Sequence, residues 1–159
     1  MITAAKPAMV PLRVLLVGRK EEDFYLIREI LERMRTILSA ELDHAHSIEE
    51  AKAMLEASPY GLILFEHETG DAAAVNLLTQ FLHAGAAVPF IVLTEDADER
   101  KIAEVIQGES WNCLTKSQLD GATLIRTIRS TIAMHGLQQE RQSAELSLRK
   151  LSYAVEQSA

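Results

Sequence analysis

Glu66, Thr94 and Lys116 are the side chains whose types and positions in this sequence suggest chemistry. Each follows an apolar run of strand length, which is typical of a buried parallel strand covered by helices on both sides. Because ligands gather beyond the carboxyl ends of such strands, we expect these residues to line one crevice. Arg19, in the polar loop after an earlier apolar run, adds a second cation. Two cations there would favour a small anionic ligand.

Four apolar runs and one weaker, more polar segment, Glu41–His46, are predicted to be strands, and the segments between them have apolar residues at helical spacing. This alternation indicates an α/β fold with a doubly wound, five-stranded parallel sheet and helices on both faces. Right-handed crossovers leave few ways to wind such a sheet. The predicted strands are Leu12–Val17, Glu41–His46, Leu62–Phe65, Phe90–Leu93 and Trp111–Leu114.

Short polar residues mark where the predicted helices begin. Asp23 is predicted to be the N-cap of a first helix that runs to about residue 36. Ser47, followed three residues later by Glu50, forms a capping-box pattern at the start of the second helix. Two more helices are predicted from Asp71 and from Asp96 or Asp98, and a fifth is predicted after Asp120.

The apolar spacing changes at Gly136, beyond which apolar positions alternate steps of four and three residues, as in a coiled-coil seam. Such a helix has no domain of its own to pack on. We therefore expect it to form a homodimer or to lead into a downstream domain, and the alternative is a frayed, solvated tail. Gly136 costs about 1 kcal/mol in a helix relative to alanine, which predicts a break or a hinge. The seam positions are Leu137, Arg141, Ala144, Leu148, Leu151 and Val155.

These patterns divide the chain into a lead-in at 1–10, an α/β domain at 11–135 and a coiled-coil helix at 136–159. The 159 residues are 48% hydrophobic, which is enough to bury a core. The formal charge of −7 comes without clustered basic residues and argues against nucleic acid as a partner. No apolar run approaches the roughly 20 residues needed to span a membrane. The single cysteine, Cys113, agrees with a reducing, cytoplasmic location.

Other candidate residues favour structural roles over catalysis or ligand binding. His44, His46 and His67 would be candidate metal ligands, but alternating residues on an edge strand are expected to face solvent. Cys113 is expected to be a buried small hydrophobe. Gly18 stands alone after the first strand, so no glycine-rich phosphate loop supports a nucleotide enzyme. We predict no catalytic residue, metal or cofactor.

The order and spacing of these elements resemble the receiver domains of two-component response regulators, the CheY-like domains. The resemblance covers about Leu12–Met134 and implies the flavodoxin-like strand order 2-1-3-4-5. Its best local matches are Leu62–Glu66, Ile91–Thr94 and Cys113–Gly121. The tail Leu148–Ser158 looks like the helix that precedes PAS sensor domains, which implies a longer signalling protein with a PAS-type domain following.

The resemblance implies a site that this sequence has partly lost. In receiver domains an aspartate at the position of Glu66 accepts a phosphoryl group from a histidine kinase, and two acidic residues after the first strand help to hold Mg²⁺. That acidic pair maps here to Gly18 and Arg19. The strand-five aromatic that switches in the family maps to Cys113, and the proline that follows the lysine is Ser117.

A charge count carries the main hypothesis. Three carboxylates and one lysine sum to −2, which suits a divalent cation, whereas Glu66 with Lys116 and Arg19 sums to +1. Without the metal, phosphoryl transfer loses the charge stabilisation on which it depends. We therefore expect a non-enzymatic, phosphorylation-independent receiver for dimerisation and signal relay. The alternatives are a working phosphoacceptor served by a histidine kinase and a binder of small anions.

Two residues keep alternative interpretations within this hypothesis. Glu66 is one methylene longer than aspartate and can bond Thr94 and Lys116 permanently, in something like the switched-on arrangement, or it is an ordinary solvated acid. Arg19 is a fixed cation that replaces the metal, or it faces water.

Overall fold

The computed structural model describes residues 10–67, 88–95 and 111–158, apart from the side chains of His67, Trp111 and 156–158. The helices predicted from Asp71 and from Asp96 or Asp98 lie outside these residues. No helix of the described part is both long and apolar enough to cross a membrane.

Five parallel strands form one sheet with the order β2-β1-β3-β4-β5. This arrangement confirms the predicted fold class and strand order, and each predicted strand matches to within about one or two residues. The strands are β1 (Leu12–Val17), β2 (Ala40–Ala45), β3 (Leu62–His67), β4 (Phe90–Thr94) and β5 (Trp111–Thr115).

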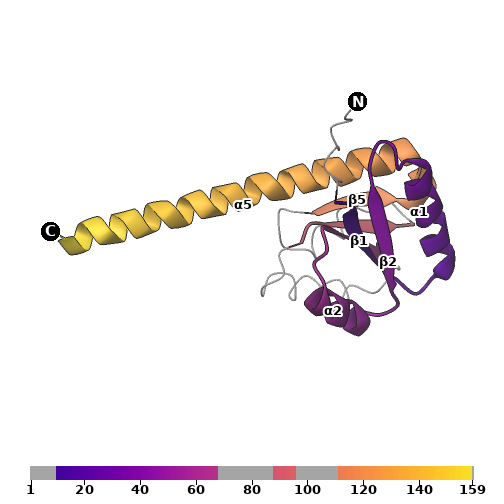
Figure 1. The fold of residues 1–159 in the computed structure, drawn as a ribbon, viewed down its shortest axis with the longest axis horizontal. Coiled ribbons are helices and arrows are strands. Elements are labelled where there is room, and N and C mark those ends of the chain that lie inside the picture. Colours follow the sequence, from indigo (N-terminus) through magenta and orange to yellow (C-terminus); the bar gives the residue numbers. More distant parts are fainter. Residues whose placement is uncertain (1–9, 68–87, 96–110, 159) are drawn as a thin grey trace, which may run out of the picture.

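The sheet is buried on both faces, as its apolar runs predict. Successive side chains of a strand point to opposite faces, so β1 places Leu15 and Val17 in one core and Val14 and Leu16 in the other. The first core is completed by residues of α2 (Ile48–Ala57), and the second by residues of α1 (Glu21–Arg33) and α5 (Gly121–Ser158). Figure 1 shows α1 and α2 on either side of the strands.

The start of α2 follows its sequence signal closely. Ser47 is the N-cap, and its hydroxyl accepts a hydrogen bond of 3.1 Å from the backbone N–H of Glu50. The Glu50 carboxylate accepts from the backbone N–H of His46 at 3.0 Å, one residue earlier than a capping box requires. The predicted helix start at Ser47 is therefore confirmed.

The predicted start of α1 is wrong by three residues. Lys20 occupies the N-cap position, and Asp23 lies in the first turn together with Glu21 and Glu22. Acidic side chains in a first turn are favoured by the helix dipole, so this run stabilises the helix without a side-chain cap. Asp23 is consequently available for contacts outside its own helix.

One continuous helix, α5, forms the C-terminal part of the molecule. Asp120 stabilises its start, since its carboxylate accepts a hydrogen bond of 2.7 Å from the backbone N–H of Thr123. Leu124, Ile125 and Ile128 are buried against the sheet, as predicted. The helix passes through Gly136, so of the two alternatives predicted there the break is wrong, whereas the hinge stays a prediction. In Figure 1 the later part of α5 projects away from the sheet.

Candidate functional site

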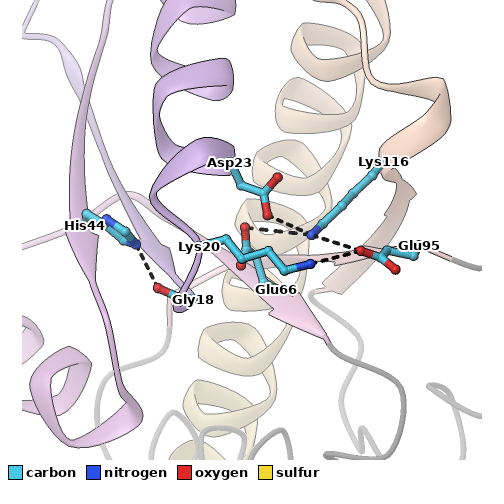
Figure 2. A network of polar contacts seen from close by, with 7 residues as sticks. All are labelled: Gly18, Lys20, Asp23, His44, Glu66, Glu95 and Lys116. Atoms are coloured by element: carbon cyan, nitrogen blue, oxygen red, sulfur yellow. Dashed lines mark hydrogen bonds and ion pairs between the residues drawn. The ribbon is translucent and has the colours of Figure 1, made fainter.

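Charged side chains from separate segments meet at the carboxyl end of the sheet (Figure 2). Glu66 is the penultimate residue of β3, and Lys116 begins the short 3-10 helix η1 (Lys116–Gln118) directly after β5. Glu95 follows β4, whereas Lys20 and Asp23 come from the start of α1. The structure thus brings the predicted residues Glu66 and Lys116 together and adds three that the sequence analysis missed.

Glu66 is buried, and Gly18 makes room for it. The Glu66 side chain is only 3% exposed. A Cβ atom on Gly18 would lie 2.6 Å from Cδ and 2.8 Å from Cγ of Glu66, closer than real Cβ atoms approach other groups. Glycine at position 18, where the receiver resemblance expects an acid, is therefore what admits the longer glutamate side chain.

Lys116 is bound to carboxylates on several sides. Its Nζ atom lies 2.8 Å from Asp23 Oδ2, 3.9 Å from Glu66 Oε1 and 4.0 Å from Glu95 Oε1. Glu95 also pairs with Lys20 at 3.1 Å, so a chain of charges joins the carboxyl ends of β3, β4 and β5 to the start of α1. The Lys116–Asp23 contact is the shortest of the lysine contacts, and its side chains are only 17% and 19% exposed.

The two acids of this pocket have pKa values that move in opposite directions. Burial raises the pKa of Glu66 to about 8, with a contribution from the hydrogen bond to Asp23. Burial also acts to raise the pKa of Asp23, but its hydrogen bonds with Glu66 and Lys116 outweigh burial and lower it. At neutral pH Glu66 therefore keeps its proton, and its hydroxyl donates the hydrogen bond that the Asp23 carboxylate accepts.

This protonation state changes the charge count of the site. Asp23 and Glu95 each contribute −1, Lys20 and Lys116 each contribute +1, and protonated Glu66 contributes nothing, so the five residues balance to zero. The expected sum of +1 from Glu66, Lys116 and Arg19 is wrong for two reasons: Glu66 is neutral, and Arg19 is exposed while Lys20 contacts Glu95. Of the alternatives for Arg19, exposure supports the one in which it faces water.

The predicted hydrogen bond between Glu66 and Thr94 is not formed. Thr94 is buried, and its Oγ1 atom has no hydrogen-bond partner among the described residues. Glu66 Oε1 also has no hydrogen-bond partner among the described residues. Lys116 Nζ, at 3.9 Å, is close enough for an ion pair but too far for a hydrogen bond. The interpretation of Glu66 as a solvated acid is also wrong, because the side chain is buried.

His44 supports the site from behind Gly18, which corrects its predicted solvent-facing position. Its Nε2 atom donates to the Gly18 carbonyl oxygen at 2.7 Å, and its ring stacks on Phe24 with centroids 5.0 Å apart. His46 is exposed, as predicted, and its ring nitrogens lie 3.5 Å from Glu50 and 3.9 Å from Glu21. His44 thereby fixes the loop whose glycine faces Glu66.

Cys113 packs against the core on the α2 side of the sheet, as expected of a small hydrophobe. It occupies the position that the receiver resemblance gives to a switching aromatic.

Mg²⁺, which the receiver resemblance implies, does not fit this donor set. Mg²⁺ is bound through carboxylate oxygens. Here Lys116 binds Asp23, Glu66 keeps its proton and Gly18 offers no side-chain oxygen. Within residues 10–67, 88–95 and 111–158, no three histidine, cysteine, aspartate or glutamate side chains gather closely enough to hold a metal ion.

Solved receiver domains share this architecture. A signal receiver domain of an HD domain-containing protein from Pseudomonas fluorescens matches with a TM-score of 0.66 and 20% identity, over 87% of this chain and 99% of that one. The receiver domain of a sensor histidine kinase from Pseudomonas aeruginosa, with magnesium coordinated in its active-site cleft, matches with a TM-score of 0.59 and 19% identity, over 78% and 99%.

A third match is an adenylate cyclase structure from Rhodopirellula baltica, with a TM-score of 0.60 and 17% identity, over 85% of this chain and 97% of that one. No protein-family model matches the chain, and no curated protein matches it in sequence. The structural matches establish the fold: this chain has the CheY-like receiver fold.

Proposed function

We propose that this chain is a non-enzymatic signal-relay module of the two-component type that works without phosphorylation and dimerises through α5. The observation that carries the proposal is the 2.8 Å pair of Lys116 with Asp23 beside a buried, protonated Glu66. In receiver domains the lysine pairs with the phosphoryl group. Here Asp23, an acid of the chain itself, already pairs with Lys116.

The pocket also lacks a competent nucleophile. Transfer of a phosphoryl group to a carboxylate needs an ionised oxygen in line with the donor and a cation to neutralise the developing charge. Glu66 is neutral at pH 7, its side chain is 3% exposed, and its carboxyl group packs against Gly18. These features support constitutive signalling over a phosphorylation cycle.

The exposed part of α5 supports a dimer of two copies of the chain. Leu137, Leu148, Leu151 and Val155 are all exposed. Together with Arg141 and Ala144 they recur with steps of four and three residues, as a coiled-coil seam requires. Arg141, at a central seam position, lies 3.6 Å from Glu145 on the same helix. A seam of this length is marginal by itself, so we expect the dimer of this chain only at micromolar concentration or above. A following PAS-type domain or a histidine kinase is the proposed partner for the relay.

Light scattering on the full chain at micromolar concentration tests the dimer. Leu148→Glu should shift the wild-type dimer to a monomer because it places a charge in the seam. Leu146→Glu is the matched control, because Leu146 is 55% exposed and Leu148 is 65% exposed. The two positions are two residues apart, so Leu146 points about 200° around the helix from Leu148 and lies off the seam. A monomeric wild type, or equal effects of the two variants, would refute this part of the proposal.

A second candidate function is the binding of a small anion. The Thr94 hydroxyl, which has no hydrogen-bond partner in the described ranges of the chain, and the Lys116 ammonium would provide hydrogen-bond donors for it. Inorganic phosphate and nucleotides in a thermal-shift screen test this candidate, and a concentration-dependent rise in Tm that Lys116→Met abolishes would establish it over the leading proposal.

A further inference from the structure

Lys116 lies within reach of two carboxyl groups and hydrogen-bonds one of them. Its Nζ atom donates to Asp23 Oδ2 at 2.8 Å, whereas Glu66 Oε1 is 3.9 Å away and has no hydrogen-bond partner among the described residues. The Glu66 side chain is 3% exposed and the Asp23 side chain 19%, so both carboxyl groups meet the same lysine away from most of the solvent. The arrangement is two largely shielded acids with a single lysine to share, and each acid affects the pKa of the other.

We propose that the Glu66–Asp23 pair is a proton-binding site, and that release of its proton draws Lys116 from Asp23 towards Glu66. In the proton-bound state the Glu66 hydroxyl donates to the Asp23 carboxylate, and Lys116 neutralises Asp23. Release sends the proton to water and leaves two carboxylates side by side. The new charge on Glu66 repels Asp23 and attracts Lys116. The Glu66 oxygen nearest to Lys116, Oε1, has no hydrogen-bond partner within the part of the chain that the structure describes.

The charged groups around Glu66 set where this equilibrium lies. Asp23 from α1 opposes ionisation, whereas Lys116 after β5 and Lys20 at the start of α1 favour it. Glu95, which follows β4, partly neutralises the charge of both lysines. Gly18, which directly follows β1 and faces Glu66, has no charged side chain. Burial is the largest influence and raises the pKa of Glu66 to about 8, so the proton is exchanged near physiological pH.

Movement of Lys116 has a direct route to the projecting helix. Lys116 is the first residue of η1, and α5 begins only five positions later at Gly121. A shift of the lysine therefore acts on the segment that sets the start of α5. That output rests on the proposed function, in which α5 relays the signal, whereas the proton equilibrium itself does not.

Carbon-detected NMR of the glutamate and aspartate side-chain carboxyls in the full chain, titrated from pH 5 to 10, tests the site. We expect Glu66 to titrate with a midpoint near 8, so that about a tenth is ionised at pH 7 and about nine tenths at pH 9. The Asp23 carboxyl resonance should move through the same midpoint as Lys116 leaves it. A Glu66 midpoint below pH 6, or an Asp23 resonance that does not respond, would overturn the proposal.

Two variants separate this inference from the proposed function. Glu66→Gln should remove the transition of Asp23 near pH 8, since the amide donates permanently. Leu148→Glu, which tests the dimer, should leave the Glu66 midpoint unchanged. If the chain is monomeric but Glu66 still titrates near 8, only the relay fails; if the dimer forms but Glu66 titrates as an ordinary acid, only the proton site fails.

Discussion

The pocket at the end of the sheet and the distal part of α5 use side chains in opposite ways. In the pocket, acids and lysines lie within ion-pair distance of one another, and their charges sum to zero. Along the distal helix, apolar side chains such as Leu148 and Leu151 stay exposed. A region that neutralises itself does not recruit charged groups from outside, whereas exposed apolar residues at coiled-coil spacing gain free energy from a partner.

Under the proposed function, the pocket would be the input of the molecule and the projecting helix its output. The pocket would respond to changes in its own charge, and the helix to association with a partner. The predictions below test whether the two regions are as different as this comparison requires, and they run from the largest expected effect to the smallest.

Removal of the central lysine should have the largest effect on stability. Lys116→Met leaves Asp23 in a mostly buried position without its cation, and we expect the free energy of unfolding to fall by about 3 kcal/mol. Lys20→Met is the control, because its pair with Glu95 is exposed and should cost less than about 1 kcal/mol. Urea unfolding measures both, and equal losses would show that the pocket is not organised around Lys116.

A side chain at position 18 should cause the second-largest loss of stability. Gly18→Ala places a Cβ within 2.6 Å of the Glu66 Cδ atom, and overpacking of this kind costs about 2 kcal/mol. Glu66→Asp shortens the opposing side chain, so the double variant should recover part of the loss. A double-mutant cycle measures the coupling, and purely additive losses would contradict the fit between the two residues.

Stability should depend on pH through Glu66. The pKa of Glu66 is about 8 in the folded chain against 4.5 as its ordinary value, so between these limits the folded chain binds a proton that the unfolded chain has released. Stability therefore falls as pH rises through this window, by at most about 1.4 kcal/mol per pH unit. Glu66→Gln should lack this slope in urea unfolding at several pH values.

Asp23 acts in the opposite sense at lower pH. Its pKa is lowered from 3.8, so it contributes stability above that value that is lost as pH falls below it. Stability that rises steadily from pH 4.5 to 8 in the wild type would contradict the assignment of the proton to Glu66.

The smallest change is expected in the helix. Gly136 lies within α5, and a Cβ there would meet nothing within 4 Å. Gly136→Ala should therefore raise helix stability by about 1 kcal/mol without disturbing any contact. Circular dichroism during thermal unfolding measures the gain. A loss as large as that of Gly18→Ala would show that the two glycines do not differ as the comparison requires.

The sheet could be predicted from the sequence because its evidence is local. Buried parallel strands have no polar face, and runs such as Leu62–Phe65 therefore mark both their position and their environment. Glu66 and Lys116 could be identified for the same reason, since each lies at the end of such a run. Ser47 similarly predicted the start of α2, because a serine three residues before a glutamate is typical of a helix N-cap.

The rest of the site depends on how separate segments meet, which spacing does not encode. Asp23 satisfied the rules for a helix cap, yet it lies one turn inside α1 and reaches Lys116, 93 positions away in sequence. Lys20 and Glu95 are ordinary polar residues of loops until the fold pairs them. Glu95 had one usable signal: it directly follows Thr94, at the predicted crevice.

Protonation was the least predictable feature. A glutamate at a strand end has its ordinary pKa unless burial and a neighbouring acid raise it, and both depend on tertiary packing. The sequence placed Gly18 and Glu66 in the site separately, but their complementary sizes became evident only where the side chain of one fills the space left by the other.

The most direct test of the account is the mass of the full chain after incubation with acetyl phosphate and Mg²⁺. Because Lys116 is bound by Asp23 and Glu66 keeps its proton at pH 7, the account predicts an unchanged mass. Stoichiometric gain of one phosphoryl group that depends on Mg²⁺ and is lost in Glu66→Gln would contradict it.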